Sequence, residues 1–286
     1  MASRNPVLTR AAETATGQDG FAYDEGKNAY AQAAGMAATG APATSLDALQ
    51  TAYDTPGPGT GRLTLDDVIV KTAIAFVFTV VGAVVGWRLA PSMPLVLWVA
   101  MLVGLGLGFA NSLMKRVIPA LVIAYALVEG VFLGGISFAY NQLAIANNYY
   151  GIVQQAVIGT LVAFAVTLVL YRTGVIKVGA RTRRMFLVAM VSYLVIGLAS
   201  FVAALFGVGS GWGFYGVGTI GIVLCVLGVG LAAFSLIMDF DLISQAVRAG
   251  APEHESWRLA FGLLVTLIWL YLELLRLISI IAASNR

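Results

Sequence analysis

Seven apolar runs of about 20 residues each fill most of this chain after residue 67. A helix of that length, rising about 1.5 Å per residue, crosses the ~30 Å hydrocarbon layer of a bilayer. Backbone groups cannot stay unpaired in lipid, so helices are the expected form. The sequence therefore predicts an all-α membrane protein, a bundle of seven transmembrane helices. The expected spans are Val68–Leu89, Pro94–Met114, Pro119–Tyr140, Val153–Tyr171, Met185–Leu205, Thr219–Ile237 and Ala260–Ala282.

Composition agrees with a membrane protein and argues against several kinds of site. Charged residues make up 11% of the chain, whereas a soluble domain usually has about 25%. The single cysteine, Cys225, cannot form an intramolecular disulfide, and with one histidine a zinc or thiol-redox site is not expected. The glycine pairs do not lie between a strand and a helix, so they predict close helix packing rather than a nucleotide site. We therefore expect no cofactor and no nucleic-acid partner.

The first 63 residues differ from the rest of the chain. They are polar and rich in Ala, Gly, Thr and Pro. Such a segment has too little apolar surface to offset the entropy lost on ordering, which predicts a disordered cytoplasmic tail over residues 1–63. Thr64, followed by Asp66 and Asp67, is typical of a helix start. Residues 64–286 are expected to form the membrane domain.

Basic residues fall in alternate loops between the predicted spans. The other loops and the C-terminal end hold only Arg88 and Arg286. Cytoplasmic loops of membrane proteins carry the excess of Lys and Arg. The distribution predicts a cytoplasmic N-terminus and a C-terminus outside. The loops after the second, fourth and sixth spans hold Lys115, Arg116, Arg172, Lys177, Arg181, Arg183, Arg184, Arg248 and Arg258.

Ionisable residues cluster around the last two spans. Asp239 and Asp241 end the sixth apolar run, and Glu273 and Arg276 lie inside the seventh. A charged side chain at membrane depth costs about 2.5–3.5 kcal/mol on insertion scales and commonly marks an ion or proton path. Helix residues two apart do not share a face, so we expect Asp239 to point inward and Asp241 to be a solvated helix end. Glu273 and Arg276 share a face and are able to pair, either for function or for structure.

Glu129 is a further acid near mid-membrane, in the third span. Desolvation disfavours its charged form, so it is expected either to make a structural hydrogen bond or to take part in transport. Counting residues places Glu129 level with Glu273, and Asp239 one or two turns or more closer to the cytoplasm. This staggered set of acids predicts a path for a cation or for protons. Two acids that meet would share a proton at low pH and bind a cation at higher pH.

Four features together resemble a known family. They are MDFDLI in the sixth span, Trp257 in the hairpin, WLYLELLRL in the seventh span and EGVFLGGIS in the third. The chain resembles the Bax inhibitor-1/YccA family, also called transmembrane Bax inhibitor motif proteins, over about residues 64–284. NPVL near the N-terminus and the long tail are similar to a bacterial branch. The resemblance implies a seven-helix bundle with a central last helix, in the bacterial cytoplasmic (inner) membrane.

The same resemblance implies functions and site residues. Members are associated with a pH-sensitive calcium leak and with suppression of cell death, and a bacterial member modulates a membrane-bound protease. The family's paired acids correspond to Asp239 and Glu273, which would be the calcium ligands. Glutamate replaces the usual aspartate on the seventh helix, and the 34-residue separation is longer than the family spacing, so direct pairing is left open. The second span has no arginine, so Arg276 is the candidate counter-charge.

Two functions remain in competition. The first is a pH-gated leak of calcium, another cation or protons, using Asp239, Glu273 and Glu129, with Asp241 at the cytoplasmic mouth. The second is a non-transporting regulator that binds a membrane-bound protease or another partner. An intramembrane aspartyl protease is not favoured, because no pair of YD and GxGD motifs is present and one acid is a glutamate. No enzyme activity is expected.

Overall fold

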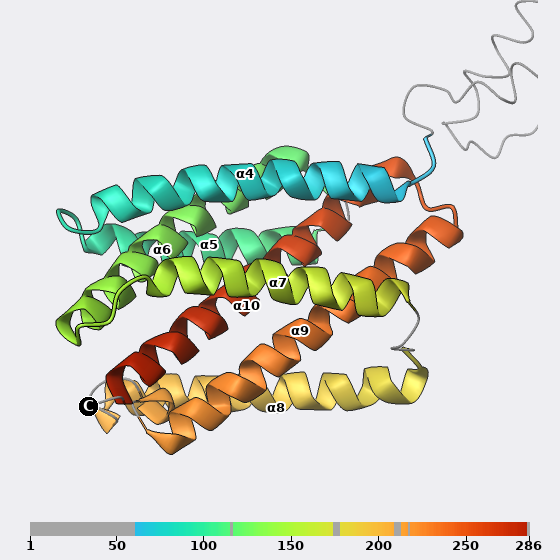
Figure 1. Ribbon diagram of the computed structural model, residues 1–286. Coiled ribbons are helices and arrows are strands. Elements are labelled where there is room, and N and C mark those ends of the chain that lie inside the picture. The colour runs from blue at the N-terminus through green and yellow to red at the C-terminus, as the bar shows by residue number, and fades with distance from the viewer. Residues whose placement is uncertain (1–60, 115–116, 174–177, 209–212, 217, 285–286) are drawn as a thin grey trace, which may run out of the picture. The chain divides into compact units, whose positions relative to one another are not determined.

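The computed structural model describes residues 61–114, 117–173, 178–208, 213–216 and 218–284, and Figure 1 shows their arrangement. Seven of the helices are long and apolar enough to cross a membrane, which confirms the predicted fold class. The predicted tail falls almost entirely outside the described residues. The spanning helices are α4 (Leu65–Leu89), α5 (Leu95–Leu113), α6 (Pro119–Ala146), α7 (Ile152–Arg172), α8 (Ala180–Leu205), α9 (Thr219–Arg248) and α10 (Ser256–Ser284). Two short 3₁₀ helices are η2 (Gly213–Tyr215) and η3 (Glu253–Glu255).

The first spanning helix begins at a capping box. The Thr64 hydroxyl accepts a hydrogen bond from the Asp67 backbone N–H at 3.2 Å, and the Asp67 carboxylate accepts one from the Thr64 backbone N–H at 2.9 Å. These bonds satisfy two of the backbone donors that a helix start leaves open. They start α4 three residues before the predicted span, so that Asp66 and Asp67 lie in its first turn.

Helices α4 and α6 pack backbone against backbone through glycines. A Cβ atom at Gly82 would lie 2.3 Å from the carbonyl oxygen of Leu127, and one at Gly134 would lie 1.9 Å from that of Ala83. Neither distance is compatible with a side chain. The small residues therefore permit the closest helix approach, as their spacing predicts.

The last helix, α10, forms the centre of the bundle. It packs against α4, α6, α7 and α9, and Figure 1 shows it crossing behind α4 and α7. Its buried side chains contribute to four apolar clusters, through Leu263 and Leu270, through Leu264 and Ile268, through Leu275, and through Ile280. By contrast, α8 buries only Ser200 among its residues. The central position implied for the last helix is confirmed.

Helix α9 is longer than predicted. It continues to Arg248, so Asp239 and Asp241 lie within the helix and not at its end. Phe240 and Ile243 are buried in the core beyond the point where the apolar run stops. The helix thus continues as an amphipathic segment, with one apolar face, which a search for an uninterrupted apolar run does not detect.

The chain just before α4 pairs with the connection between α9 and α10. Arg62 and Pro252 form an isolated antiparallel bridge, flanked by hydrogen bonds from Leu63 N to Ala251 O and from Glu253 N to Gly61 O, both 2.8 Å. Deeper in α4, Lys71 binds the same connection: its Nζ lies 2.6 Å from Ser256 Oγ and 3.3 Å from Glu253 Oε1. The beginning of the membrane domain is therefore fastened to its last helical hairpin.

Candidate functional site

Glu273 is the most enclosed acid of the bundle. Its side chain projects from α10 toward α8 and α9, and the residue is 7% exposed. Oε1 accepts hydrogen bonds from Tyr193 Oη at 2.7 Å and from Trp269 Nε1 at 3.1 Å, whereas Oε2 is buried without a partner. A Cβ atom at Gly228 of α9 would lie 2.6 Å from the carboxyl carbon. The absence of a side chain at Gly228 therefore makes room for this carboxyl group.

Asp239 faces α10 from the other end of α9. Its carboxyl group lies near the Thr266 hydroxyl of α10, which donates to Gly262 O at 3.2 Å, while Oδ2 is buried without a partner. The prediction that Asp239 points into the bundle agrees with this position. Each of the two acids thus has one buried oxygen without a partner.

Asp239 and Glu273 do not meet. Asp239 contacts Thr266, and Glu273 follows seven residues later on the same helix, which corresponds to a rise of about 10 Å. Glu273 instead lies against Gly228, eleven residues before Asp239 on α9. The long sequence separation between the two acids is the cause, because it places them at different heights of an antiparallel helix pair. They form two separate sites and not a carboxyl pair.

Arg276 lies close to Glu273 without forming an ion pair with it. The guanidinium carbon is 3.9 Å from the ring centre of Tyr215 in η2, a cation–π contact. Its Nε is buried without a hydrogen-bond partner. Among the described residues, the ion pairs within 4.0 Å do not include these two side chains. A role of Arg276 as counter-charge, acting over a longer distance, stays a prediction.

Glu129 lies in a different part of the bundle, between α5 and α6. A Cβ atom at Gly104 of α5 would lie 2.5 Å from Glu129 Oε2. As at Glu273, a glycine on the neighbouring helix leaves space for the carboxyl group. The structure does not bring Glu129 into contact with the acids of α9 and α10.

The prediction that Glu129 and Glu273 lie at the same depth in the membrane is wrong. The hydroxyl of Tyr271 lies 2.6 Å from Ser137 Oγ, and Ser137 is eight residues, or about 12 Å, beyond Glu129 along α6. Glu273, two residues after Tyr271, is therefore two or more turns farther from the start of α6 than Glu129. The earlier start of α10, at Ser256 and not at Ala260, accounts for one of these turns.

Asp239 is at about the level of Glu129 instead. Its neighbour Thr266 is five residues before Tyr271, which contacts Ser137 of α6, and Ser137 is eight residues after Glu129. At about 1.5 Å per residue, these spacings place Asp239 within about one turn of Glu129. Asp239 is nevertheless nearer than Glu273 to the end of the bundle that carries most basic residues, as expected.

Asp241 is not a solvated helix end. It forms an ion pair with Arg183 at the start of α8 and accepts a hydrogen bond from Gln245 Nε2 at 2.6 Å. Its side chain is 13% exposed. These partners allow an acid to lie within α9 near the membrane surface, and they tie α9 to α8.

Several residues around Glu273 were not identified from the sequence. Trp269 is four residues before Glu273 on the same helix, a spacing that places both on one face and could have been used. Tyr193 and Gly228 reach the site from other helices. The Tyr193 contact joins residues 80 positions apart, and no sequence spacing predicts it.

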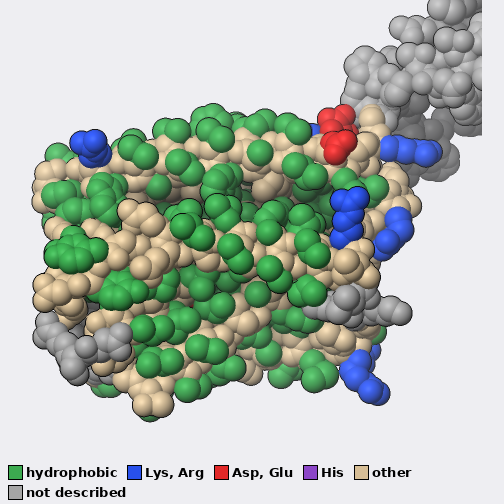
Figure 2. Space-filling view, viewed as in Figure 1, with side chains coloured by type: hydrophobic (Ala, Val, Ile, Leu, Met, Phe, Trp, Pro, Cys, Tyr) green, Lys and Arg blue, Asp and Glu red, His purple; other side chains and the backbone are tan. Residues whose placement is uncertain are grey.

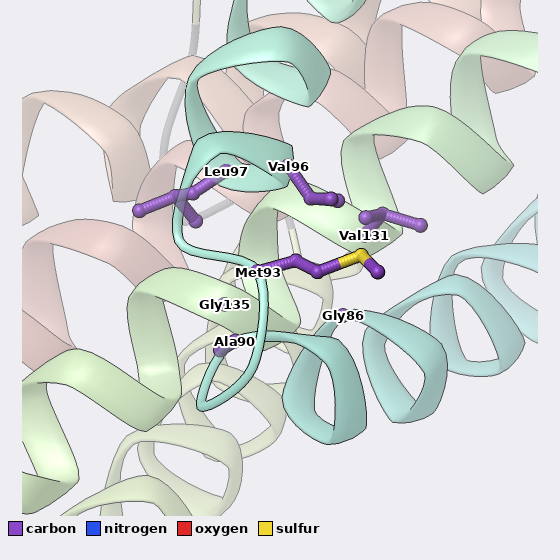
Figure 3. A pocket seen from close by; sticks show the side chains of 7 residues that line it. All are labelled: Gly86, Ala90, Met93, Val96, Leu97, Val131 and Gly135. Carbon is purple, nitrogen blue, oxygen red and sulfur yellow. The ribbon is translucent and has the colours of Figure 1, made fainter.

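The described residues contain no group of three or more His, Cys, Asp or Glu side chains that could hold a metal ion. A cation bound at Asp239 would thus have one carboxylate ligand, and so would a cation bound at Glu273. A small cavity between α4, α5 and α6 is lined by Met93, Leu97 and other apolar residues (Figure 3). Its volume is about 10 Å³, room for at most one water molecule, so it is not a ligand site.

Comparison with family models matches residues 5–283 to the family described as Bax inhibitor 1 like. The match begins at Asn5, far before the membrane domain, and so includes the NPVL segment and the tail. A comparison with curated proteins gives no match.

Proposed function

Because the chain belongs to the Bax inhibitor 1 like family, we propose that it is a multi-pass membrane protein through which a cation leaks under the control of protons on buried acids. Calcium is the proposed ion. In the proposed pathway, the ion binds at Asp239 on α9 and at Glu273 on α10, one after the other. No resident cofactor and no enzymatic reaction are part of the proposal.

One observation carries this proposal: Asp239 and Glu273 each have a buried oxygen without a partner. An ionised carboxylate at membrane depth costs about 2.5–3.5 kcal/mol even on insertion scales. A bound proton or a bound cation removes much of this cost, because either one supplies the missing partner. Each acid is therefore suited to exchange a proton for a cation.

The two positions act in sequence because they lie at different heights. A cation entering from the basic end would meet Asp239 first and Glu273 about 10 Å farther on. At low pH both acids hold protons and offer no charge to the ion. At higher pH they lose them, so the flux increases with pH.

We propose that the basic end is cytoplasmic. Lys and Arg side chains gather where α4 begins, whereas the opposite end shows little basic charge on this face (Figure 2). The excess of basic residues marks the cytoplasmic side of membrane proteins. The C-terminus would then lie outside, and the proposed location is the bacterial inner membrane.

The test is calcium entry into liposomes that contain the purified protein and a calcium-sensitive dye, at pH 6 and pH 8. We expect wild-type flux to be higher at pH 8. Asp239→Asn and Glu273→Gln should remove this difference, because neither side chain can lose a proton. The matched control is Glu255→Gln, since Glu255 lies in the hairpin and pairs with Arg258 outside the bundle.

Flux no greater than in empty liposomes, with all variants folded, would overturn the proposal. The alternative is then the regulator that binds a membrane-bound protease. One observation favours it: the chain preceding α4 is fastened to the α9–α10 hairpin, so a partner bound to the N-terminal region could act on both helices. Glu129→Gln tests the course of the proposed pathway, because Glu129 lies against α5, away from Asp239 and Glu273, and its neutralisation should leave the pH dependence of the flux intact.

A further inference from the structure

A long apolar groove opens on the membrane-facing side of the bundle. Helices α4 and α7 form its walls, and α6 and α10 form its floor. This face is the one seen in Figure 2, where hydrophobic side chains cover the area between the two walls. The volume of the groove is about 690 Å³, within the range of about 300–1,000 Å³ that ligand sites occupy.

The length of the groove matches the thickness of a membrane. Its wall on α4 extends from Ile69 to Arg88, a rise of about 28 Å. The hydrocarbon layer of a bilayer is about 30 Å thick. The groove therefore lies along the direction of the lipid chains and opens to them from the side.

The few polar groups in the groove are already satisfied within the protein. The hydroxyls of Thr72, Thr79 and Thr160 donate to carbonyl oxygens of their own helices at 2.7, 3.0 and 2.8 Å. Ser137 and Tyr271 bind each other at 2.6 Å. Apart from Trp87 and Arg88 at one end, the described lining thus has its hydroxyl groups bonded within the protein, which disfavours water or a polar ligand there and suits a hydrocarbon chain.

One end of the groove carries a positively charged side chain. Trp87 and Arg88 line the end near the α4–α5 connection, and Arg88 is in the last turn of α4. An indole ring prefers the level of lipid headgroups, and a guanidinium binds phosphate through two parallel hydrogen bonds. One end therefore has the chemistry of a headgroup site, while the remainder has that of an acyl-chain site.

We propose that the half of this groove next to Arg88 holds one phospholipid of the leaflet on the α4–α5 side, with its phosphate at Arg88 and an acyl chain between α4 and α7 over about 15 Å, half of the hydrocarbon thickness. The concave shape distinguishes this site from the convex helix surfaces that contact bulk lipid. The lipid would fill the space between two helices that pack on α6 and α10 from opposite sides. It would act as a structural part of the bundle.

The test uses the full chain in a non-ionic detergent, with phosphatidylglycerol or phosphatidylcholine added, and counts bound lipids by native mass spectrometry. Val80→Trp and Val157→Trp would fill the groove. Val81→Trp and Ile158→Trp are matched controls, because these neighbours are similarly exposed but do not line it. Thermal unfolding of each variant verifies that it is folded.

We expect the wild type and both controls to retain one lipid per chain, and the two groove variants to lose about tenfold in affinity. Arg88→Gln should weaken binding about threefold, the weight of one exposed charge pair. Equal lipid binding by a groove variant and its control would overturn the proposal, as would a wild type without a retained lipid. A dimer in the mass spectrum of the wild type that becomes a monomer in the Val80→Trp variant would also overturn the proposal. The groove would then be the contact surface for a second copy of this chain.

Discussion

Replacing Gly228 with alanine tests whether the close contact between α9 and Glu273 is as tight as the structure indicates. The new Cβ atom would lie 2.3 Å from Tyr193 Oη and 2.6 Å from the carboxyl carbon of Glu273. Both groups must move, and their 2.7 Å hydrogen bond is then lost. Gly228→Ala therefore acts on the site without changing any of its ionisable groups.

The expected effect on stability has three parts. Overpacking costs about 1–3 kcal/mol, and losing the hydrogen bond costs about 1 kcal/mol. Alanine is favoured over glycine in a helix by about 1 kcal/mol. We expect the free energy of unfolding to fall by about 2 kcal/mol. Reversible unfolding in mixed detergent micelles, followed by circular dichroism, measures it.

The control is two residues away on the same helix. A Cβ atom at Gly230 has no atom within 4 Å, so Gly230→Ala should leave stability unchanged or raise it by up to about 1 kcal/mol. Glu273→Asp shortens the acid by one methylene and should relieve the clash with the carboxyl group, though not that with Tyr193, giving a coupling with Gly228→Ala of about 1 kcal/mol. Equal stability of the Gly228→Ala and Gly230→Ala variants would refute the reasoning.

Three further substitutions probe the packing, the hydrogen bonds and the helix start. Gly134→Ala should separate α4 from α6 and lower the free energy of unfolding by about 3 kcal/mol. Gly106→Ala has open space around it and should not lower this free energy; unfolding in the same mixed micelles compares the two variants. Tyr193→Phe removes a donor to Glu273 and should cost about 1–3 kcal/mol; an unchanged midpoint would contradict the 2.7 Å bond. Thr64→Ala should cost about 1 kcal/mol and speed amide hydrogen exchange in the first turn of α4 alone.

The sequence predicts the seven helices because membrane depth imposes a simple rule, an apolar run of a given length. The rule fails at α9, where the helix continues past Asp239 and Asp241 once lateral contacts compensate the charge. Arg183, the partner of Asp241, comes from another helix, and its choice depends on how α8 packs. Helix existence is a local property, whereas helix ends depend on tertiary contacts.

In the candidate site, too, local features can be predicted from the sequence, whereas tertiary contacts cannot. The sequence identifies Asp239 and Glu273, because acids are rare in apolar runs. It does not reveal their separation, since that depends on the register of α9 against α10. Nor does it reveal that glycines at positions 104 and 228 shape the space around two of the acids. A glycine's partner is known only when the helices are assembled.

The fastening of residues 61–63 to the α9–α10 connection also bears on how the protein is made. Ribosomes release α4 before the other spanning helices described, and its Lys71 enters the membrane region long before Ser256 and Glu253 have been synthesised. Until then the ammonium group lacks both partners, and this end of the bundle is open. The last hairpin closes it, so this end of the bundle is completed only after the α9–α10 connection has been made. A ribosome stalled before residue 251 would leave a membrane protein with most of its helices inserted but its first helix still unfastened.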